Sequence, residues 1–146
     1  MVLKNYRTLT STQSYDGTAS TQVTDLPRDF LIQRILLDFQ GTTVLSGTSV
    51  LVQDALLQCV TAIRVKAVGE GSSRTIFDVK GNDLYYMNLF DYGFGTALTN
   101  TDTAAATYTQ KTAFTIDMRI NKQDPDDFSV AIPSYLLSTL QLEIEY

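Results

Sequence analysis

The chain has 146 residues, of which 44% are hydrophobic and 18% charged, a composition typical of one globular domain and not of a disordered tail. It has no histidine and one cysteine, which excludes Ser-His and Cys-His catalytic pairs, His-ligated zinc and an intramolecular disulfide. Its 11 basic and 16 acidic residues give a net charge of −5, which disfavours binding to nucleic acid or to an anionic membrane surface.

The N-terminal segment is polar. Residues 8–24 are dominated by Thr, Ser, Gln and Gly, which bury little apolar surface, although Thr and Val favour extended backbone. We therefore expect residues 1–24 to form an arm or an edge strand that acts between molecules, and residues 25–146 to form the body of a single β-domain, 1–146. No apolar stretch has the length of a signal-peptide core or of a membrane span, so a protein that is soluble when made is expected.

The first strand of this body is predicted over Phe30–Phe39, and Gly41 is expected to end it. The apolar residues on its one face are Leu31, Ile35, Leu37 and Phe39. A β-hairpin is predicted next, with strands over Ala62–Val68 and Arg74–Lys80 and a Gly-rich loop between them. Shorter strands are expected near 5–10, 20–24 and 42–46 and at Phe128–Ile132, for a total of eight or nine.

The clearest two-residue periodicity lies in the last third of the chain. An alternation of apolar and polar residues places one face of a strand in the core and the other in water. The first apolar set is Phe114, Ile116, Met118 and Ile120, which alternates with Thr115, Asp117 and Arg119. The second apolar set is Leu140, Leu142, Ile144 and Tyr146. We expect both apolar sets to be buried, with the strand at the C-terminus closing the fold.

Two connections between strands have a helical pattern. Ser49 is expected to cap the first, in which Val52, Leu56, Cys59 and Val60 share a face, with Cys59 as a small buried hydrophobe. Asn82 or Asp83 is expected to cap the second, Leu84–Phe90. Many short alternating strands with little helix predict an all-β fold, specifically a single jelly-roll sandwich or barrel with one or two short helices in inter-strand connections.

We assign no catalytic residue and expect the protein not to be an enzyme. Carboxylates alone can support glycoside hydrolysis. However, Glu143 and Glu145 alternate outward on the last strand, and Asp78 and Asp117 lie in strand patterns, which is ordinary usage of a protein surface.

Three carboxylates, those of Asp124, Asp126 and Asp127, gather in one predicted turn and could hold a cation such as calcium. The segment lacks the spacing and the glycine of an EF-hand loop, and Asp-Pro-Asp is a frequent turn sequence, so a solvated turn is the favoured interpretation. No other metal site and no cofactor site is predicted.

Aromatic residues are densest just after the predicted hairpin. The cluster comprises Tyr85, Tyr86, Phe90, Tyr92 and Phe94. Rings at this spacing can cover the end of a barrel, fill a pocket of a partner protein or stack on a sugar. We interpret those that face outward as protein contact residues, because the chain has no Trp and no nearby cluster of sugar-binding donors.

The order of these segments resembles that of a known protein family. Arg28–Gly41 is followed by an apolar helix-like run, the strand Ile63–Val68, a Gly turn, Ile76–Leu84 and finally Ala131–Tyr146. Over residues 25–146 this order resembles the jelly-roll capsid proteins of membrane-containing, tailless icosahedral viruses, in particular those that build shells from vertical single jelly rolls. The resemblance implies a barrel that associates with itself or with a sister capsid protein into capsomers above an internal membrane, without a cofactor or a small-molecule substrate.

The leading hypothesis is therefore a structural virion protein, a small major capsid protein that is soluble in the host cytoplasm before assembly. The alternative is a carbohydrate- or receptor-binding β-sandwich, such as a spike or accessory module. The absence of Trp counts against that alternative, because glycan sites rely on exposed aromatic rings.

Overall fold

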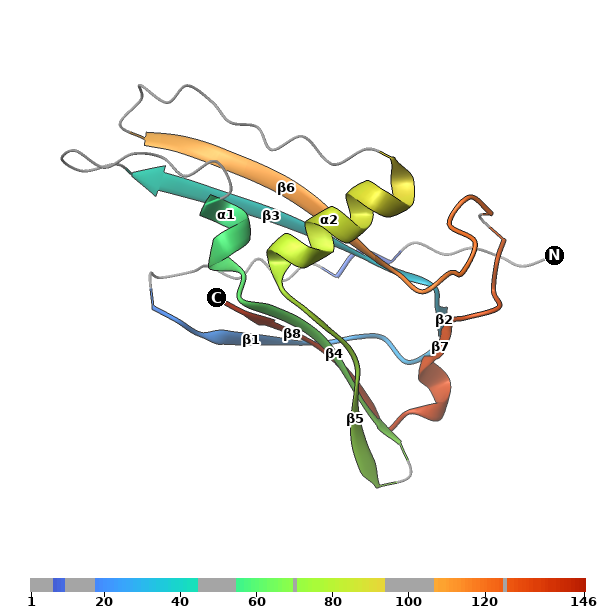
Figure 1. The fold of residues 1–146 in the computed structure, drawn as a ribbon. Coiled ribbons are helices and arrows are strands. Elements are labelled where there is room, and N and C mark those ends of the chain that lie inside the picture. Colours follow the sequence, from blue (N-terminus) through green and yellow to red (C-terminus); the bar gives the residue numbers. More distant parts are fainter. Residues whose placement is uncertain (1–6, 10–17, 45–54, 70, 94–106, 125) are drawn as a thin grey trace.

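The computed structural model describes residues 7–9, 18–44, 55–69, 71–93, 107–124 and 126–146 (Figure 1). One layer is an antiparallel sheet in the order β1-β8-β4-β5. Its strands are β1 (Thr21–Asp25), β8 (Thr139–Glu145), β4 (Ala62–Gly69) and β5 (Ser72–Val79). Two long antiparallel strands, β3 (Arg34–Val44) and β6 (Thr107–Asp117), form a second layer above it in Figure 1.

Shorter elements complete the described fold. The strands β2 (Leu31–Ile32) and β7 (Ile132–Pro133) pair at one end of the molecule, and the short 3-10 helix η1 (Ser134–Leu136) follows β7. The helices are α1 (Ala55–Cys59) and α2 (Gly81–Tyr92). In the view of Figure 1, α1 lies between the two layers, whereas α2 crosses β3 and β6. No helix within the described ranges is long and apolar enough to cross a membrane.

The four-stranded sheet follows the predicted alternation. In β8, which lies between β1 and β4, Leu140 and Leu142 are buried, and Ile144 is partly buried against the same core. The alternate carboxylates form ion pairs with β4, Glu143 with Lys66 at 2.7 Å and Glu145 with Arg64 at 2.8 Å. The predicted hairpin is also confirmed, since β4 and β5 pair directly and Gly71 between them has a φ of 80°, which favours glycine.

The core lies between the two layers. Phe114 and Ile116 of β6 are buried together with Leu37 and Phe39 of β3, and the rings of Phe39 and Phe114 meet edge to face with centroids 5.2 Å apart. These residues form one cluster with the inner side chains of β4 and β8 and with buried leucines of both helices. The strands and helices therefore share a single apolar interior.

The two long strands end at positions that differ from the prediction. Gly41 does not terminate β3, which continues to Val44. A Cβ at Gly41 would lie 2.7 Å from Cδ1 of Leu56, so the glycine makes room for the side chain beside α1. In turn, β6 stops at Asp117, which leaves Ile120 outside the strand and 74% exposed, contrary to its predicted burial.

The predicted helix positions also need correction. Cys59 is exposed, because α1 is only five residues long and turns Leu57, followed by Val60, into the core instead. Helix α2 begins at Gly81 with Lys80 as its N-cap, and no side chain caps it, so neither Asn82 nor Asp83 has the predicted role. The predicted cap of the first helix, Ser49, lies outside the described residues.

Two predicted strands are shorter or interrupted. The segment Phe30–Phe39 is broken at Gln33, whose side-chain amide donates to the carbonyl of Asp127 at 2.7 Å. The segment Phe128–Ile132 contributes only β7, because the backbone before it is held in a turn in which Ser129 N donates to Asp127 Oδ1 at 2.9 Å.

Candidate assembly surfaces

Helix α2 separates the predicted aromatic cluster into inner and outer rings. Its side chains at four-residue spacing, Leu84 and Asn88, face the body of the protein. Phe90 is 90% exposed and Tyr86 is also exposed, whereas Tyr85 packs against the core. The exposed apolar and aromatic residues of this helix form what we call the α2 face: Tyr86, Met87, Leu89 and Phe90. Phe94 lies outside the described residues.

Asn88 holds α2 against the edge of β6 that faces away from β3. Its Nδ2 donates to the carbonyl of Thr115 at 2.8 Å, and Thr115 N donates to its Oδ1 at 2.7 Å. The amide thus satisfies both backbone groups of one residue, as a neighbouring strand would, and it covers part of a free sheet edge. Nothing in the local sequence pattern indicates this contact, which joins residues 27 positions apart.

Asn88→Asp is expected to lower the free energy of unfolding by about 1–3 kcal/mol, because the Thr115 carbonyl loses its donor and faces a carboxylate instead. Chemical denaturation measures this loss. The matched control is Asn121→Asp, since the side-chain oxygen of Asn121 accepts from Gln123 N at 3.1 Å, and a carboxylate can still accept this bond. Equal effects of the two variants would contradict the role of the amide donor.

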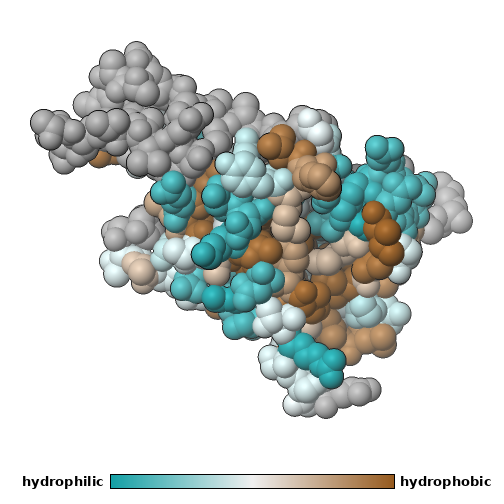
Figure 2. Space-filling view, in the orientation of Figure 1, coloured by the Kyte–Doolittle hydropathy of each residue, from teal (hydrophilic) through white to brown (hydrophobic). Residues whose placement is uncertain are grey.

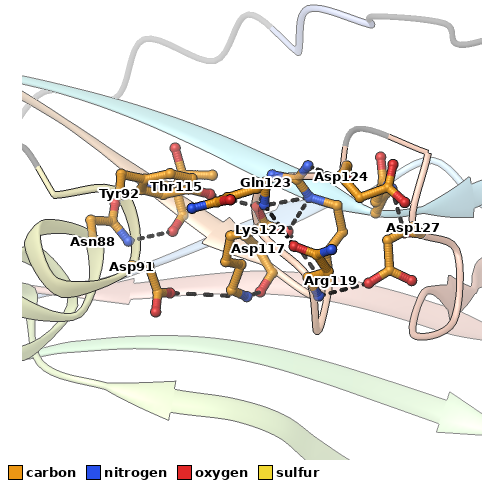
Figure 3. Close-up of polar contacts among 12 residues, drawn as sticks. Asn88, Asp91, Tyr92, Thr115, Asp117, Arg119, Lys122, Gln123, Asp124 and Asp127 are labelled. Carbon is orange, nitrogen blue, oxygen red and sulfur yellow. Dashed lines mark hydrogen bonds and ion pairs between the residues drawn. The ribbon is translucent and has the colours of Figure 1, made fainter.

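A buried ion pair lies beside the C-terminal end of α2 (Figure 3). Arg119 donates from Nε to Oδ1 of Asp117 at 3.0 Å and from Nη2 to Oδ2 at 2.5 Å, and the side chains of Arg119 and Asp117 are only 3% and 2% exposed. The hydroxyl of Tyr92 donates to the same carboxylate at 2.5 Å. This arrangement corrects one expectation, because Asp117 and Arg119 do not face water. The half-buried Tyr92 uses its hydroxyl for a contact within the chain.

The pair shifts the titration of its members. Burial alone would raise the pKa of Asp117, but the hydrogen bonds from Arg119 and Tyr92 outweigh it and lower this pKa to about 2. Burial, together with the neighbouring carboxylate of Asp117, raises the pKa of Tyr92 to about 12. Over the pH range between these values the carboxylate is ionised and the phenol neutral, so this hydrogen-bonded arrangement is preserved.

The loop after β6 is held by hydrogen bonds from Arg119 and from Lys122. Arg119 Nη1 donates to the carbonyl of Asp124 at 2.9 Å, and Lys122 Nζ donates to the carbonyl of Asp117 at 2.7 Å (Figure 3). Lys122 also lies 3.9 Å from the carboxylate of Asp91 on α2. The polar cluster therefore joins β6, α2 and the following loop, and its role is structural.

The acidic turn uses its carboxylates for its own backbone. Asp124 Oδ1 accepts from Asp126 N at 2.8 Å, and Asp127 accepts from Asn121 N at 2.7 Å. Hydrogen bonds led by that from the Ser129 hydroxyl lower the pKa of Asp127 to about 2. Within the described residues, no group of three or more His, Cys, Asp or Glu side chains could hold a metal ion. These contacts are those of a hydrogen-bonded turn.

A second apolar surface lies at the end of the molecule where β2, β7 and η1 meet, on the right of the hydropathy view (Figure 2). Leu31 pairs with Pro133, and the Ser134 hydroxyl donates to the carbonyl of Phe30, so two segments about 100 residues apart are fixed together. Their exposed apolar side chains form what we call the end patch: Phe30, Leu31, Tyr135 and Leu136. The sequence did not predict this patch, because it exists only through this long-range pairing.

No family model matches the chain, and no curated protein sequence matches it significantly. Among solved structures, the fold is similar to that in "Crystal Structure of the STIV MCP", with a TM-score of 0.64 and 18% sequence identity. The similarity covers 91% of this chain and 39% of the STIV chain, so this chain spans well under half the length of that protein. At this identity the similarity shows the fold, and the predicted jelly-roll fold of the present chain is thereby confirmed.

Proposed function

We propose that this chain is a structural virion protein, a small major capsid protein whose copies assemble into capsomers by self-association or with a second capsid protein. The observation that carries this proposal is the jelly-roll fold shared with the STIV major capsid protein over 91% of the chain. On this proposal the protein resides in the capsid, near an internal viral membrane, and its function is assembly without catalysis.

The length relationship supports a subunit with one barrel. The similarity covers 39% of the STIV chain. Its sheets and helices share one apolar core, which supports a subunit built around one barrel. A shell would then be built from single barrels standing side by side.

The exposed apolar side chains supply surfaces for such contacts. Single exposed apolar residues are common, whereas neighbouring ones at a protein surface mark interaction sites. The α2 face presents Phe90 almost fully to solvent next to Tyr86, and the end patch presents four further apolar or aromatic side chains. Aromatic residues that become desolvated at an interface are the typical anchors of protein association.

Tyr86→Ser combined with Phe90→Ser is expected to weaken assembly about 30-fold or more, since loss of one interface anchor costs roughly 2 kcal/mol. Native mass spectrometry of the purified protein, over a concentration series, measures the distribution of oligomers. The fold should be unchanged by circular dichroism, because both side chains are exposed.

The matched control is Ile76→Ser, which removes an exposed apolar side chain from β5, away from both surfaces. It is expected to leave assembly intact. A wild-type protein that forms no assembly larger than a dimer and binds glycans on an array would overturn the capsid proposal in favour of a carbohydrate-binding module.

A further inference from the structure

Within the described parts of the chain, the outer edge of the eleven-residue strand β3 has no pairing strand. Its inner edge pairs with β6 from Arg34 to Val44, and no other strand in the described parts of the chain pairs with it. At the opposite edge of this two-stranded layer, the side chain of Asn88 covers the backbone of β6 at Thr115. Among the described residues, β3 therefore presents the long uncovered edge of this layer.

The backbone groups on that edge can be identified from the register. Leu36 lies opposite Thr115, and both backbone groups of Thr115 bond to Asn88, so these two residues form a non-hydrogen-bonded pair. The N–H and C=O groups of Leu36 consequently point away from β6. Because this direction alternates along a strand, those of Arg34 and Asp38 point the same way.

The edges of the four-stranded sheet are protected by features that β3 lacks. At one edge, β1 has only five residues. At the other, β5 meets a register shift between Val65 and Lys66 of its neighbour β4. Short length and irregular register are usual means of preventing edge-to-edge pairing. By contrast, β3 is long, and its pairing with β6 is regular throughout.

The side chains on the same positions are self-complementary. Leu36 is 75% exposed, and Arg34 and Asp38, two residues to either side of it, are both exposed. Neither charge has an ion pair within the described chain. If two copies of β3 pair in antiparallel with Leu36 opposite itself, Arg34 of each copy lies opposite Asp38 of the other.

We infer that β3 is the contact between two copies of this chain, joined edge to edge about a two-fold axis at Leu36. The pairing provides three hydrogen-bonded residue pairs, hence about six backbone hydrogen bonds, two cross-strand ion pairs and a central leucine contact. It extends the layer to four strands, β6-β3-β3-β6, and is an isologous interface. This inference rests on the proposed function, for which it names one assembly contact.

Leu36→Lys tests the contact, because it places two like charges opposite each other at the axis. We expect the dissociation constant of the dimer, measured by sedimentation or light scattering across a dilution series, to rise about tenfold or more. The matched control is Val44→Lys, at a similarly exposed position on the same strand but outside the predicted pairing. The control should dimerise like the wild type. Equal behaviour of the two variants overturns the inference.

A charge exchange tests the register. Arg34→Asp and Asp38→Arg should each weaken the dimer, since each places like charges opposite one another. The double variant restores both ion pairs and should return the dissociation constant to within a few-fold of the wild-type value. Two single variants that weaken the dimer without recovery in the double variant would overturn the proposed register.

The outcomes separate this inference from the proposed function. Wild-type protein that assembles beyond the dimer, with assembly unaffected by Leu36→Lys, supports the capsid role and overturns the β3 contact. Wild-type protein that stops at a dimer sensitive to Leu36→Lys supports the contact and contradicts the capsid role. A wild-type protein that is monomeric at all concentrations overturns the β3 contact.

Discussion

Replacing Arg119 with methionine is expected to lower the free energy of unfolding by about 3 kcal/mol. The substitution keeps most of the apolar stem but removes the guanidinium that binds the carboxylate of Asp117, whose side chain is 2% exposed. An ionised carboxylate without its partner is costly beneath a protein surface, and losing one member of a buried pair typically costs about 3–5 kcal/mol. We expect the lower end, because the pair lies under a surface loop and Tyr92 still donates to the carboxylate.

Urea denaturation at pH 7 measures this loss. The control variant combines Arg119→Met with Asp117→Leu, which removes both charges and should recover much of the stability, since a buried pair contributes little compared with apolar side chains of similar size. A loss below about 1 kcal/mol in the single variant would contradict the burial of the pair.

The pH dependence distinguishes the lost pair from lost packing. In the wild type the lowered pKa of Asp117 stabilises the fold above its unfolded value near 4, and this contribution is lost as the pH falls toward about 2. In Arg119→Met, burial without the guanidinium raises that pKa, so acid neutralises the unpaired carboxylate and relieves its cost. The stability difference between the two proteins should therefore narrow from pH 7 to pH 4, whereas a packing defect would persist.

Tyr92 gives the folding stability a corresponding pH dependence in the alkaline range. Its pKa is raised to about 12, so the folded state favours the neutral phenol. This contribution is complete below the unfolded value of about 10 and is lost as the pH rises from 10 toward 12. Tyr92→Phe removes the hydroxyl and should flatten this part of the stability profile, without the acid-side effect of Arg119→Met.

The sequence predicted the four-stranded sheet best. In β4 and β8 the local pattern is sufficient, because a strand with one buried face shows a two-residue period. The glycines of a tight hairpin then predict β5. The fold class follows from the number and brevity of such strands. The resemblance to capsid jelly rolls extends the same inference, since it rests on the order of the strands.

The candidate surfaces were less predictable, because contacts distant in sequence decide them. Charged residues such as Asp117 and Arg119 are placed at the surface by composition, and only the approach of Tyr92, 25 residues away, shows that they are buried. The contact of the Asn88 amide with Thr115 of β6 was unpredictable for the same reason, since these two residues are 27 positions apart. Likewise, no local pattern shows that β3 has an open edge, because that depends on which strands pair with it.

The apolar alternation from Phe114 to Ile120 shows where a local pattern stops being informative, and it leads to the last prediction. Phe114 and Ile120 belong to the same predicted face, yet Phe114 is 1% exposed and Ile120 is 74% exposed, because β6 ends at Asp117 and the chain turns away. Phe114→Ala should lower the free energy of unfolding by about 3–5 kcal/mol, since it removes a ring that packs on Phe39 and leaves a cavity between the two layers.

Ile120→Ala removes an apolar side chain from the same sequence pattern and should change the stability by no more than about 0.5 kcal/mol. Both values come from urea denaturation under identical conditions, with equal m-values required so that the difference reports the folded state. The two-residue period assigns both residues to the core, whereas the end of the β6 ladder assigns only Phe114 to it. Comparable losses in the two variants would mean that the strand continues through Ile120 and that the loop anchored by Arg119 is placed differently.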